Sequence, residues 1–504
     1  MEKIKKLEEL SKIVKDLRNQ NKKIVHCHGV FDLLHIGHIR YLEQAKKMGD
    51  ILIVTITSDK YVDKGPHRPA FTENLRAEAI ASLKCVDYTA INPWETAENT
   101  LRLLRPHVYV KGSEFKKITT DITGRIGREL KVVDEIKATL AFTEDVVFSS
   151  TNLINNYLSA FPDEIDKYLK IFRNRFSLDE IMLLLEKVST LNVLVIGDTI
   201  LDEYQFCNAI GKSSKEPILA LKYETHDLFA GGVLAVANHV ANFVNNVSLI
   251  TIIGERDSHE GFIRSQLNSK ISPCFLIQDK APTIIKRRFI EGYTLNKLFE
   301  IYVMDDSGLT DDKDNDLCEL LEENILQYDL VIVTDYGHGA ISERAKKILM
   351  NKSNFLSVNT QANAGNRGFH TISKYPHADY CCLTEYEIRL DLRDLKSDIT
   401  PLVNQTMKKY NYPRMAITSG VKGCTVYEQN KYVRIPAFTR NVVDRIGAGD
   451  AFFAITSLLS ALGENIEVVG FLGNTVGALA VEILGNKKSI DMSSVKKYIT
   501  SLLK

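Results

Sequence analysis

The most informative stretch of the 504-residue sequence is Gly29-Val-Phe-Asp-Leu-Leu-His35-Ile-Gly-His38. It follows the apolar run 24–27 and precedes the amphipathic segment 39–48, which predicts a strand, a loop and a helix in succession. The two histidines stand at the expected helix start, where backbone N–H groups and the helix dipole favour an anion. Imidazole donors there can stabilise negative charge on a phosphate. The stretch predicts a phosphate site, the alternative being that one histidine caps the helix and the other packs.

Short apolar runs alternate with longer helical patterns along the chain, which is typical of βαβ units around parallel sheets. The runs form two series, residues 24–27, 51–56 and 108–110, and then 193–196, 249–253, 330–333, 355–358 and 415–418. The interval 152–190 is helical and charged, and Ser177 with Glu180 predicts a capping box in it. We therefore expect two α/β domains, residues 1–151 and 191–504, joined by a helical linker over residues 152–190.

Composition excludes several classes of protein. Lys and Arg together number 64, as do Asp and Glu, which argues against a nucleic-acid binder that relies on bulk positive charge. No apolar stretch approaches the roughly 18 residues needed to span a bilayer, and the lysine-rich start lacks the apolar core of a signal peptide. The eight cysteines form no CxxC pair, which favours reduced thiols over a disulfide scaffold or a zinc site. We expect a cytoplasmic enzyme without nucleic-acid or membrane partners.

The stretch 29–38 resembles the cytidylyltransferase-like nucleotidyltransferases, which have a Rossmann-like sheet and an HxGH signature. The resemblance covers about residues 22–155, and its further motifs are Gly49-Asp50, Ser58-Asp59, Lys64-Gly65-Pro-His-Arg68-Pro69, Arg76, Val86-Asp87, Arg105-Pro106, Lys111-Gly112 and Phe148-Ser-Ser-Thr151. It implies that His35 and His38 are catalytic residues that contact the phosphates of a nucleoside triphosphate. Lys64 is the implied third catalytic residue, which neutralises phosphate charge, with a solvated loop as the alternative. Further candidates for that charge are Arg68 and Arg76, and the implied nucleotide-binding residues are Gly29, Phe31, Asp32, Lys111, Ser149, Ser150 and Thr151.

The same resemblance implies transfer of a nucleotidyl group, AMP from ATP or CMP from CTP. Because the incoming nucleophile is itself a phosphate, positioning and charge neutralisation with Mg²⁺ can carry the reaction without a general base. Residues 143–149 lack the Arg and Gly of the glycerol-phosphate cytidylyltransferases, which argues against glycerol phosphate as the substrate. The form Phe148-Ser-Ser-Thr151 is closer to the sugar-phosphate adenylyltransferases. The sequence does not choose between ATP and CTP.

A second phosphate motif, Asp444-Arg-Ile-Gly447-Ala448-Gly449-Asp450, precedes an apolar helical pattern. Its small residues let the backbone approach a phosphate, and the N–H groups of the helix start form an anion hole. Asp450 at the helix start can accept the proton of an attacking hydroxyl group. The arrangement suits phosphoryl transfer, with a glycine-rich turn and Asp450 as a helix cap as the alternative.

The Gly-Ala-Gly-Asp core resembles the ribokinase-like, or PfkB-type, carbohydrate kinases. The resemblance spans about residues 190–504 and includes Gly197-Asp198, Gly231-Gly232, Asp335-Tyr-Gly337-His-Gly339, Ser419-Gly420-Val-Lys-Gly423 and Gly473-Asn474. It implies a ribokinase-like α/β domain that uses ATP and has Asp450 as a catalytic residue. The implied sugar-binding residues are Asp198, Asp202, Gly231 and Gly232. The implied nucleotide-binding residues are Gly420, Gly423, Gly447, Ala448, Gly449 and Asn474, and no metal ligand is assigned.

Three departures from the PfkB pattern bear on the substrate. Ala235 stands where the family has an Asn that binds the sugar, and Asn238 is displaced by three positions. Arg445 and Ile446 replace a common pair that begins with Thr, and residues 359–368 replace the usual Asp-Pro-Lys stretch. Because losing a sugar hydrogen bond shifts specificity, we expect a substrate unlike ordinary heptose or ribose, or a weakened kinase.

Together the two domains resemble the bifunctional enzymes of ADP-heptose synthesis, with the two domains in reverse order. The chain is therefore expected to phosphorylate a sugar or sugar phosphate with ATP. It is also expected to join a sugar phosphate to a nucleotide with release of pyrophosphate, for surface glycan synthesis. One alternative keeps only the transferase active, with the kinase fold as a sugar-binding or dimerisation module. Another is a nucleotide-sensing regulator. A homodimer is expected only because ribokinase-like domains commonly pair.

Overall fold

A computed structural model describes residues 3–62, 68–112, 125–143, 161–305, 307–429, 431–439 and 441–503. The chain divides into two units, Met1–Leu169 with Lys496–Lys504, and Lys170–Val495. The division falls inside the interval 152–190, and the finer boundaries at residues 151 and 191 stay a prediction. Within the described residues, no helix is both long and apolar enough to cross a membrane.

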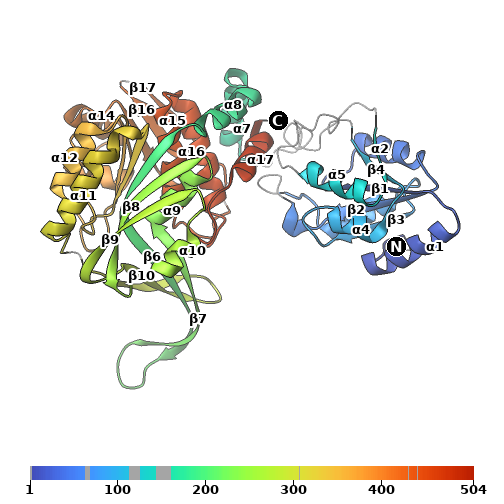
Figure 1. Ribbon diagram of the computed structural model, residues 1–504, viewed down its shortest axis with the longest axis horizontal. Helices are drawn as coiled ribbons and strands as arrows, with labels where there is room; N and C mark the ends of the chain where they lie inside the picture. The colour runs from blue at the N-terminus through green and yellow to red at the C-terminus, as the bar shows by residue number, and fades with distance from the viewer. Residues whose placement is uncertain are drawn as a thin grey trace. The chain divides into compact units, whose positions relative to one another are not determined.

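A parallel sheet of five strands forms the centre of the first unit, with the order β3-β2-β1-β4-β5 (Figure 1). The strands are β1 (Ile24–Gly29), β2 (Ile51–Thr57), β3 (Tyr88–Asn92), β4 (Val108–Lys111) and β5 (Thr139–Phe142). The helices are α1 (Leu7–Asn19), α2 (Ile36–Lys46), α3 (Glu73–Ala81), α4 (Glu98–Leu104) and α5 (Arg125–Glu135), with a 3₁₀ turn at Asp59–Tyr61. The strand order reverses between β1 and β4, and ligands of open parallel sheets bind outside the carboxyl ends of the strands at such a point.

Apolar side chains cover both faces of this sheet. On one face, side chains of α2 and α3 such as Leu42 and Ile80 pack on Val25 and Val54. On the other, α1 and α4 contribute a second cluster that includes Leu7, Leu10, Val14, Leu104, Ile24 and Ile53. Because both faces are buried, β1 and β2 can be recognised in the sequence as continuous apolar runs.

Strand β6 (Asn192–Lys212) organises the second unit because it belongs to two sheets. Its first part pairs in parallel with β8 and β12 in a main sheet of order β9-β8-β6-β12-β13-β14-β15-β16-β17. Its second part pairs with β7 and β10, and β10 continues to β11. We call this smaller sheet, of order β7-β6-β10-β11, the lid. The β6–β7 hairpin of the lid extends away from the helical layers in Figure 1.

The remaining strands are β7 (Leu219–Gly232), β8 (Asn246–Arg256), β9 (Ile271–Pro282), β10 (Ile285–Glu291), β11 (Lys297–Val303), β12 (Leu330–Asp335), β13 (Leu356–Thr360), β14 (Tyr380–Thr384), β15 (Arg414–Thr418), β16 (Cys424–Glu428) and β17 (Lys431–Ile435). The helices are α9 (Val233–Ala241), α10 (Glu260–Gln266), α11 (Asp311–Asn324), α12 (Glu343–Lys352), α13 (Glu385–Leu392), α14 (Ile399–Tyr410), α15 (Ala448–Ala461) and α16 (Ile466–Ala480). Helix α17 (Met492–Leu503) crosses the division, since residues from Lys496 onward belong to the first unit. Short 3₁₀ turns are Ile325–Gln327, Ile372–Lys374 and Gly420–Lys422.

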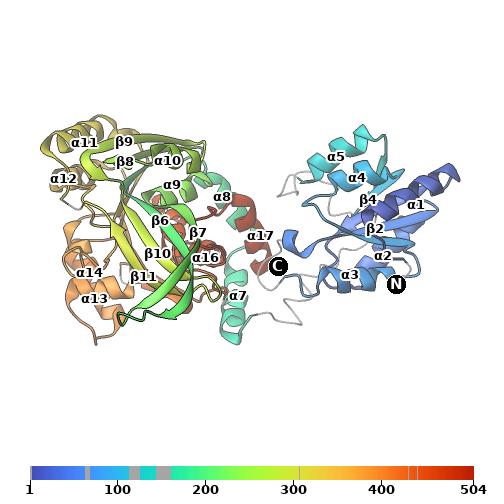
Figure 2. The same ribbon diagram turned by 90° about the horizontal axis from the view of Figure 1, so that it is seen from below.

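Helices cover both faces of the main sheet. Helices α9, α15 and α16 gather on one side and α11, α12 and α14 on the other (Figure 1), and Figure 2 shows the same layers from a perpendicular direction. The second layer buries side chains such as Leu321 and Leu349 against Val331 and Val358 of the strands. The expected α/β fold, with a parallel sheet in each domain, is confirmed.

The interval between the two series of strands contains α7 (Asp163–Arg175) and α8 (Leu178–Val188). The Ser177 hydroxyl accepts a hydrogen bond from the Glu180 N–H, and the Glu180 carboxylate accepts one from the Ser177 N–H. The expected capping box is therefore confirmed. Within the second unit, Phe172 of α7 stacks on Phe471 of α16 with 4.1 Å between ring centroids.

Candidate active sites

His35 and His38 lie together at the first turn of α2. His35 is the N-cap residue, and its Nδ1 accepts a hydrogen bond from the Gly37 N–H at 3.1 Å. The His38 ring stacks on the His35 ring with 4.0 Å between centroids and meets Phe31 edge-on at 5.3 Å. The cap and the packing contact are thus both present, and they hold two imidazoles at a helix end that favours an anion. Contact of these imidazoles with phosphate stays a prediction.

The loop between β1 and α2 has a fixed shape. Phe31 has a φ of 48°, and a Cβ on Gly29 would lie 3.1 Å from the Phe31 ring, so position 29 has little room for a larger residue. Asp32 is buried and accepts hydrogen bonds from the Arg68 guanidinium and the Ala70 N–H, both at 2.5 Å. These contacts give the loop a defined shape, and nucleotide binding by Gly29, Phe31 and Asp32 stays a prediction.

Arg76 has a positioning role that the sequence did not reveal. Its buried guanidinium donates hydrogen bonds to the carbonyl groups of Val30 and Thr57 and to the Asp59 carboxylate. The side chain thereby ties the loop after β1 to the end of β2. Because its donors are engaged by protein acceptors, we assign Arg76 to positioning and not to neutralisation of phosphate charge.

Lys111, at the end of β4, forms a buried ion pair with Glu129 of α5 at 2.7 Å. Glu129 also accepts a hydrogen bond from the Tyr109 hydroxyl at 2.9 Å. Although burial raises the pKa of Glu129, the Lys111 ammonium and its other neighbours lower it to about 2. The ion pair fixes the end of β4 beside the point where the strand order reverses, and nucleotide binding by Lys111 stays a prediction.

Two histidines of β1 were missed in the sequence. The buried His26 ring contacts the Thr55 hydroxyl at 2.8 Å, and His28 contacts the same hydroxyl at 3.0 Å and the Thr57 hydroxyl at 3.3 Å. Burial lowers the pKa of His26 to about 3, so its imidazole is neutral near pH 7. His28 is at the carboxyl end of β1, just before the loop to α2. The alternation His26-Cys27-His28 in an apolar run could have indicated that both histidines lie on the same face of the strand.

Four of the expected residues of this site lie outside the described residues. They are Lys64, Ser149, Ser150 and Thr151.

In the second unit, Asp450 lies in the first turn of α15 and accepts a hydrogen bond from the Tyr336 hydroxyl at 2.8 Å. Burial, helped by the nearby Asp202 carboxylate, raises the pKa of Asp450 to about 6. Gly447 precedes the helix with a φ of 84°, and a Cβ there would lie 2.1 Å from the Asn486 side chain, so only glycine suits the position. The turn and the helix start have the features of an anion hole beside a candidate base.

Asp444, at the start of the same motif, is buried and holds the turn. Its carboxylate accepts hydrogen bonds from the backbone N–H groups of Ile446 at 3.2 Å and Gly485 at 3.0 Å. It also accepts one from the Tyr204 hydroxyl at 2.6 Å and pairs with Lys297 of the lid. Although burial raises the pKa of Asp444, these donors lower it below its usual value. Asp444 is therefore an ionised anchor of the anion-hole turn.

Asp202 lies in the lid part of β6 and faces the glycine pair that was expected to bind sugar. It forms an ion pair with Arg288 of β10 and lies 3.4 Å from the Asn486 amide. A Cβ on Gly231 would be 2.2 Å from the Asp202 carboxylate, and Gly232 has a φ of 56°. The glycine pair thus permits a close approach of the backbone to Asp202. The assignment of Asp202 and both glycines to the sugar stays a prediction.

Asp198 organises the loop that carries Tyr336. Its buried carboxylate accepts backbone hydrogen bonds from Tyr336 at 2.8 Å, Ala340 at 3.1 Å and His338 at 3.4 Å. Burial and the neighbouring Asp335 raise the pKa of Asp198 to about 6. The geometry gives Asp198 a role in shaping the loop, and its contact with sugar stays a prediction.

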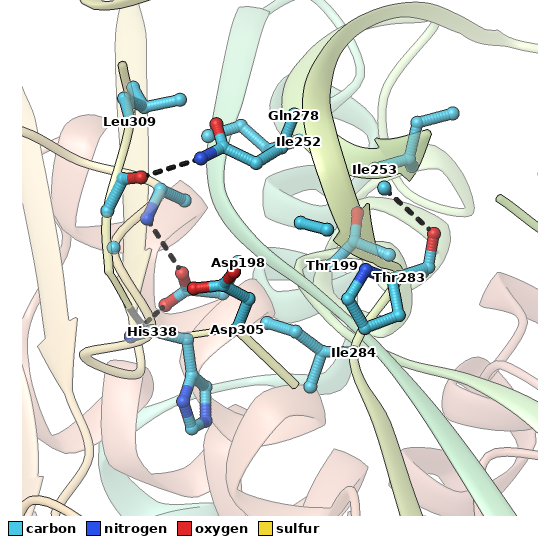
Figure 3. A pocket seen from close by; sticks show the side chains of 16 residues that line it. Asp198, Thr199, Ile252, Ile253, Gln278, Thr283, Ile284, Asp305, Leu309 and His338 are labelled. Carbon is cyan, nitrogen blue, oxygen red and sulfur yellow. Dashed lines mark hydrogen bonds between the residues drawn. The ribbon is translucent and has the colours of Figure 1, made fainter. Parts of the chain in front are cut away.

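A pocket adjoins Asp198, where β6 passes from the main sheet into the lid, near the carboxyl ends of β8 and β9 (Figure 3). Ile252, Ile284 and Leu309 give it apolar walls, and Gln278 and Asp305 add polar groups. Such a mixed lining suits a small polar molecule with an apolar face.

Two asparagines of the loop 359–368, which differs from the usual PfkB sequence, bind the backbone at Tyr336. Asn363 and Asn366 each donate a side-chain hydrogen bond to the Tyr336 carbonyl, at 2.8 and 2.9 Å. Asn238, the displaced counterpart at the glycine pair, donates to the Gln266 carbonyl at 3.1 Å. The buried Ala235 has no polar side-chain atom to offer a sugar. Loop 359–368 therefore supports the contact between Tyr336 and Asp450.

The residues expected near adenosine have well-defined backbone roles. Gly420 and Gly423 have φ values of 56° and 86°, and a Cβ on Gly423 would lie 2.1 Å from the Ile435 carbonyl oxygen. Asn474 donates hydrogen bonds to the carbonyl groups of Ile435 at 3.0 Å and Pro436 at 2.9 Å, which ties α16 to the end of β17. Contact with a nucleotide stays a prediction for all three residues.

Lys286 of β10 is a further candidate that the sequence did not single out. The side chain is buried, and its ammonium group lies over the rings of Tyr302 at 5.3 Å and Tyr336 at 5.9 Å. Burial lowers the pKa of Lys286, while Asp202 and Asp198 oppose that shift. In the sequence Lys286-Arg-Arg288 looks like a solvated charged strand, so only the fold reveals that this cation is near Asp450.

Comparison with family models defines the class of each region. The model described as "pfkB family carbohydrate kinase" matches residues 190–491, and the model "Cytidylyltransferase-like" matches residues 26–156. The chain belongs to the PfkB family of carbohydrate kinases and carries a cytidylyltransferase-like domain before the kinase domain. These families use nucleotide substrates and typically Mg²⁺.

Curated relatives match only part of the chain. "Bifunctional protein HldE" of Aliarcobacter butzleri is 43% identical over 133 residues, which are 26% of this chain and 28% of the relative. The protein of the same name from a Nitratiruptor species is 40% identical over 146 residues, 28% of this chain and 31% of the relative. The chain thus covers about a third of the length of these relatives. The matches give no support to the reversed domain order expected above, and we do not retain it.

Solved structures show the fold of the second unit. The crystal structure of phosphofructokinase-2 from Escherichia coli in complex with potassium aligns with a TM-score of 0.51 and 13% sequence identity. The alignment covers 63% of this chain and 100% of that structure. At this identity the similarity establishes a ribokinase-like fold and nothing about the substrate.

Proposed function

We propose that the protein is a bifunctional enzyme that phosphorylates a sugar or sugar phosphate with ATP and transfers AMP or CMP from a nucleoside triphosphate to a sugar phosphate. The products would be ADP from the first reaction, and pyrophosphate and a nucleotide-activated sugar from the second. The observation that supports the proposal is that candidate catalytic side chains stand at a helix start in each unit, at His35–His38 and at Gly447–Asp450. Helix starts of this kind favour anions. The name of the HldE relatives supports two activities in one chain.

In the kinase reaction, a sugar hydroxyl attacks the γ-phosphorus of ATP, and the bond to the β-phosphate oxygen breaks. Asp450 accepts the hydroxyl proton, for which a pKa of about 6 is suited near neutral pH. The N–H groups at the start of α15 stabilise the charge on the transferring phosphoryl group. Asp202 and the glycine pair, which approach one another closely, would orient the sugar beside this base.

In the transferase reaction, a phosphate oxygen of the sugar phosphate attacks the α-phosphorus of the nucleotide, and pyrophosphate leaves. His35 and His38 donate hydrogen bonds to the phosphates, and the dipole of α2 favours the same anions. Because the nucleophile is already an anion, positioning supplies the main part of the catalysis. The buried pairs of Asp32 with Arg68 and of Glu129 with Lys111 keep the site rigid.

Mg²⁺ would enter both sites with the nucleotide. No group of three or more His, Cys, Asp or Glu side chains in the described part of the chain could hold a metal by itself. This fits an ion that is bound mainly by substrate phosphates and water, with one or two carboxylates of the protein. The ion would supply charge neutralisation on the phosphates.

A matrix of the four nucleoside triphosphates against sugars and sugar phosphates, with products identified by mass spectrometry, tests both reactions. We expect ADP with a phosphorylated sugar, and pyrophosphate with a nucleotide sugar. No product in any combination would refute the proposal. Pyrophosphate release without phosphate transfer would favour the second candidate, in which the kinase fold only binds sugar or dimerises. That candidate draws on Ala235, which offers no polar atom to a sugar.

A further inference from the structure

The first residue of the lid strand β11 reaches the anion-hole turn. Lys297 pairs through its Nζ with Oδ1 of Asp444, a residue 147 positions away in the sequence. The same ammonium lies 5.4 Å from the centroid of the Tyr204 ring, whose hydroxyl donates to the other oxygen of Asp444. The contact joins the lid to the start of the Asp444–Asp450 motif.

The two partners of this ion pair differ in exposure. The Asp444 side chain is 1% exposed and is fixed by backbone donors on both sides, from Ile446 and Gly485. The Lys297 side chain is 36% exposed and belongs to an edge strand of the lid. The carboxylate is therefore part of the scaffold of the turn, whereas the ammonium is the partner that can leave.

The lid also contains the candidate sugar-binding carboxylate, because Asp202 lies in the part of β6 that pairs with β7 and β10. Arg288 of β10 pairs with Asp202, the candidate sugar-binding carboxylate, and also with Glu300 of β11 at 3.2 Å. Strands β10 and β11 are paired along their length. One two-stranded element thus contacts Asp202 at one place and Asp444 at another.

We propose that Lys297 is a positioning residue that couples the lid to the anion hole, because its ion pair with Asp444 holds the Gly447 turn in shape while the lid is closed. This inference rests on the proposed kinase function. When the lid opens, Asp444 loses its cation and its backbone contacts to Ile446 and Gly485 weaken. The N–H groups that face the transferring phosphoryl group are then less well ordered, so phosphate transfer is coupled to lid closure.

Three variants test the coupling. Lys297→Met removes the charge but keeps much of the length of the side chain, and Lys297→Arg keeps the charge. Lys431→Met is the matched control, because Lys431 is also the exposed first residue of an edge strand, β17. Amide hydrogen exchange of residues 444–450 and of Gly485 reports the order of the turn without any need for catalysis.

We expect Lys297→Met to speed exchange in the turn about tenfold, the effect of losing one hydrogen bond to a charged group. Lys297→Arg should restore slow exchange, and Lys431→Met should leave it unchanged. In phosphate transfer, Lys297→Met should lower kcat about tenfold with little change in the KM for ATP, since the turn acts on the transition state. In a fourth variant, Lys297→Ala, ammonium ion should partly restore phosphate transfer by occupying the space beside Asp444.

The proposal would be overturned if amide exchange in the turn were unchanged in Lys297→Met. It would also be overturned if exchange became equally fast in Lys297→Arg and Lys297→Met. Failure of the kinase function itself is distinguishable, because it appears as absence of phosphate transfer in the unmodified protein. In that case, amide hydrogen exchange of residues 444–450 and Gly485 still shows whether Lys297 keeps the turn ordered.

Discussion

The Tyr336 hydroxyl donates a hydrogen bond to Asp450 at 2.8 Å across 114 positions of sequence. It joins the loop after β12 to the first turn of α15, and the loop is itself held by Asp198 and by two asparagines of the 359–368 loop. The candidate base is therefore positioned by a chain of contacts that begins in the part of the sequence that departs from the PfkB pattern.

Replacing Tyr336 by Phe should shift the pH dependence of phosphate transfer. Burial and Asp202 raise the pKa of Asp450 to about 6, and the tyrosine hydrogen bond lowers it. A base must be deprotonated to act, so the rate should fall as the pH falls through about 6. Without the hydrogen bond the pKa of Asp450 rises further, and the acidic limb should move up by about one unit.

Profiles of kcat against pH for the unmodified protein and Tyr336→Phe provide the measurement. Tyr302→Phe is the control, because the Tyr302 hydroxyl donates to Glu300 and not to Asp450. An acidic limb that does not move in Tyr336→Phe would contradict the assignment of Asp450 as the base.

Replacing Lys286 by Met should separate activity from stability. Burial lowers the pKa of Lys286, so the folded state binds its proton less well than the unfolded state, and the charged side chain costs stability below the folded-state pKa. The methionine removes that cost, and we expect an unchanged or higher Tm. The same change removes a cation that lowers the pKa of Asp450, and kcat should fall at least about tenfold.

Thermal unfolding and kcat, measured on the same preparations, check this expectation. Lys346→Met is a suitable control, since Lys346 is also buried and lies 5.8 Å from a tyrosine ring, that of Tyr375, but pairs with Glu343. A large loss of Tm in Lys286→Met with normal kcat would show that the lysine is structural.

The two activities should be separable by single substitutions. His35→Ala removes an imidazole at the start of α2 and should abolish pyrophosphate release, while phosphate transfer continues. Asp450→Asn should do the reverse. Loss of the His35 helix cap should cost only about 1 kcal/mol, which is too little to unfold the unit. Assays of pyrophosphate and ADP on both variants give the measurement, and loss of both products in either variant would argue against two independent sites.

The features that could be predicted from the sequence lie within single continuous segments of the chain. His35 with His38, and Gly447 with Asp450, lie within single strand–loop–helix or turn–helix segments, so residue spacing alone places them at helix starts. The main-sheet strands β8, β12, β13 and β15 are buried on both faces and stand out as apolar runs. Helix α8 was marked by its capping box.

What the sequence did not predict depends on long-range pairing. The lid strands β10 and β11 carry Lys286, Arg288 and Lys297 among half-exposed residues, so they lack a clear apolar period. The dual membership of β6 follows from its pairing with β7 and β10, which no local pattern encodes. The contacts of Arg76 likewise join segments that are distant in sequence.

The ion pair between Arg68 and Asp32 gives a final prediction, about stability. Both side chains are almost fully buried, 5% and 0% exposed. Removing one partner of a buried ion pair leaves an uncompensated charge and typically costs about 3–5 kcal/mol, so Arg68→Met should strongly lower the unfolding free energy of the first unit. The double variant Asp32→Asn with Arg68→Met removes both charges and should recover part of the loss. Chemical unfolding followed by a probe in the first unit measures all three values, for Arg68→Met, for the single variant Asp32→Asn and for the double variant. If the double variant is destabilised by the sum of the two single effects, the residues are not coupled, and the pair does not hold the loop between β1 and α2.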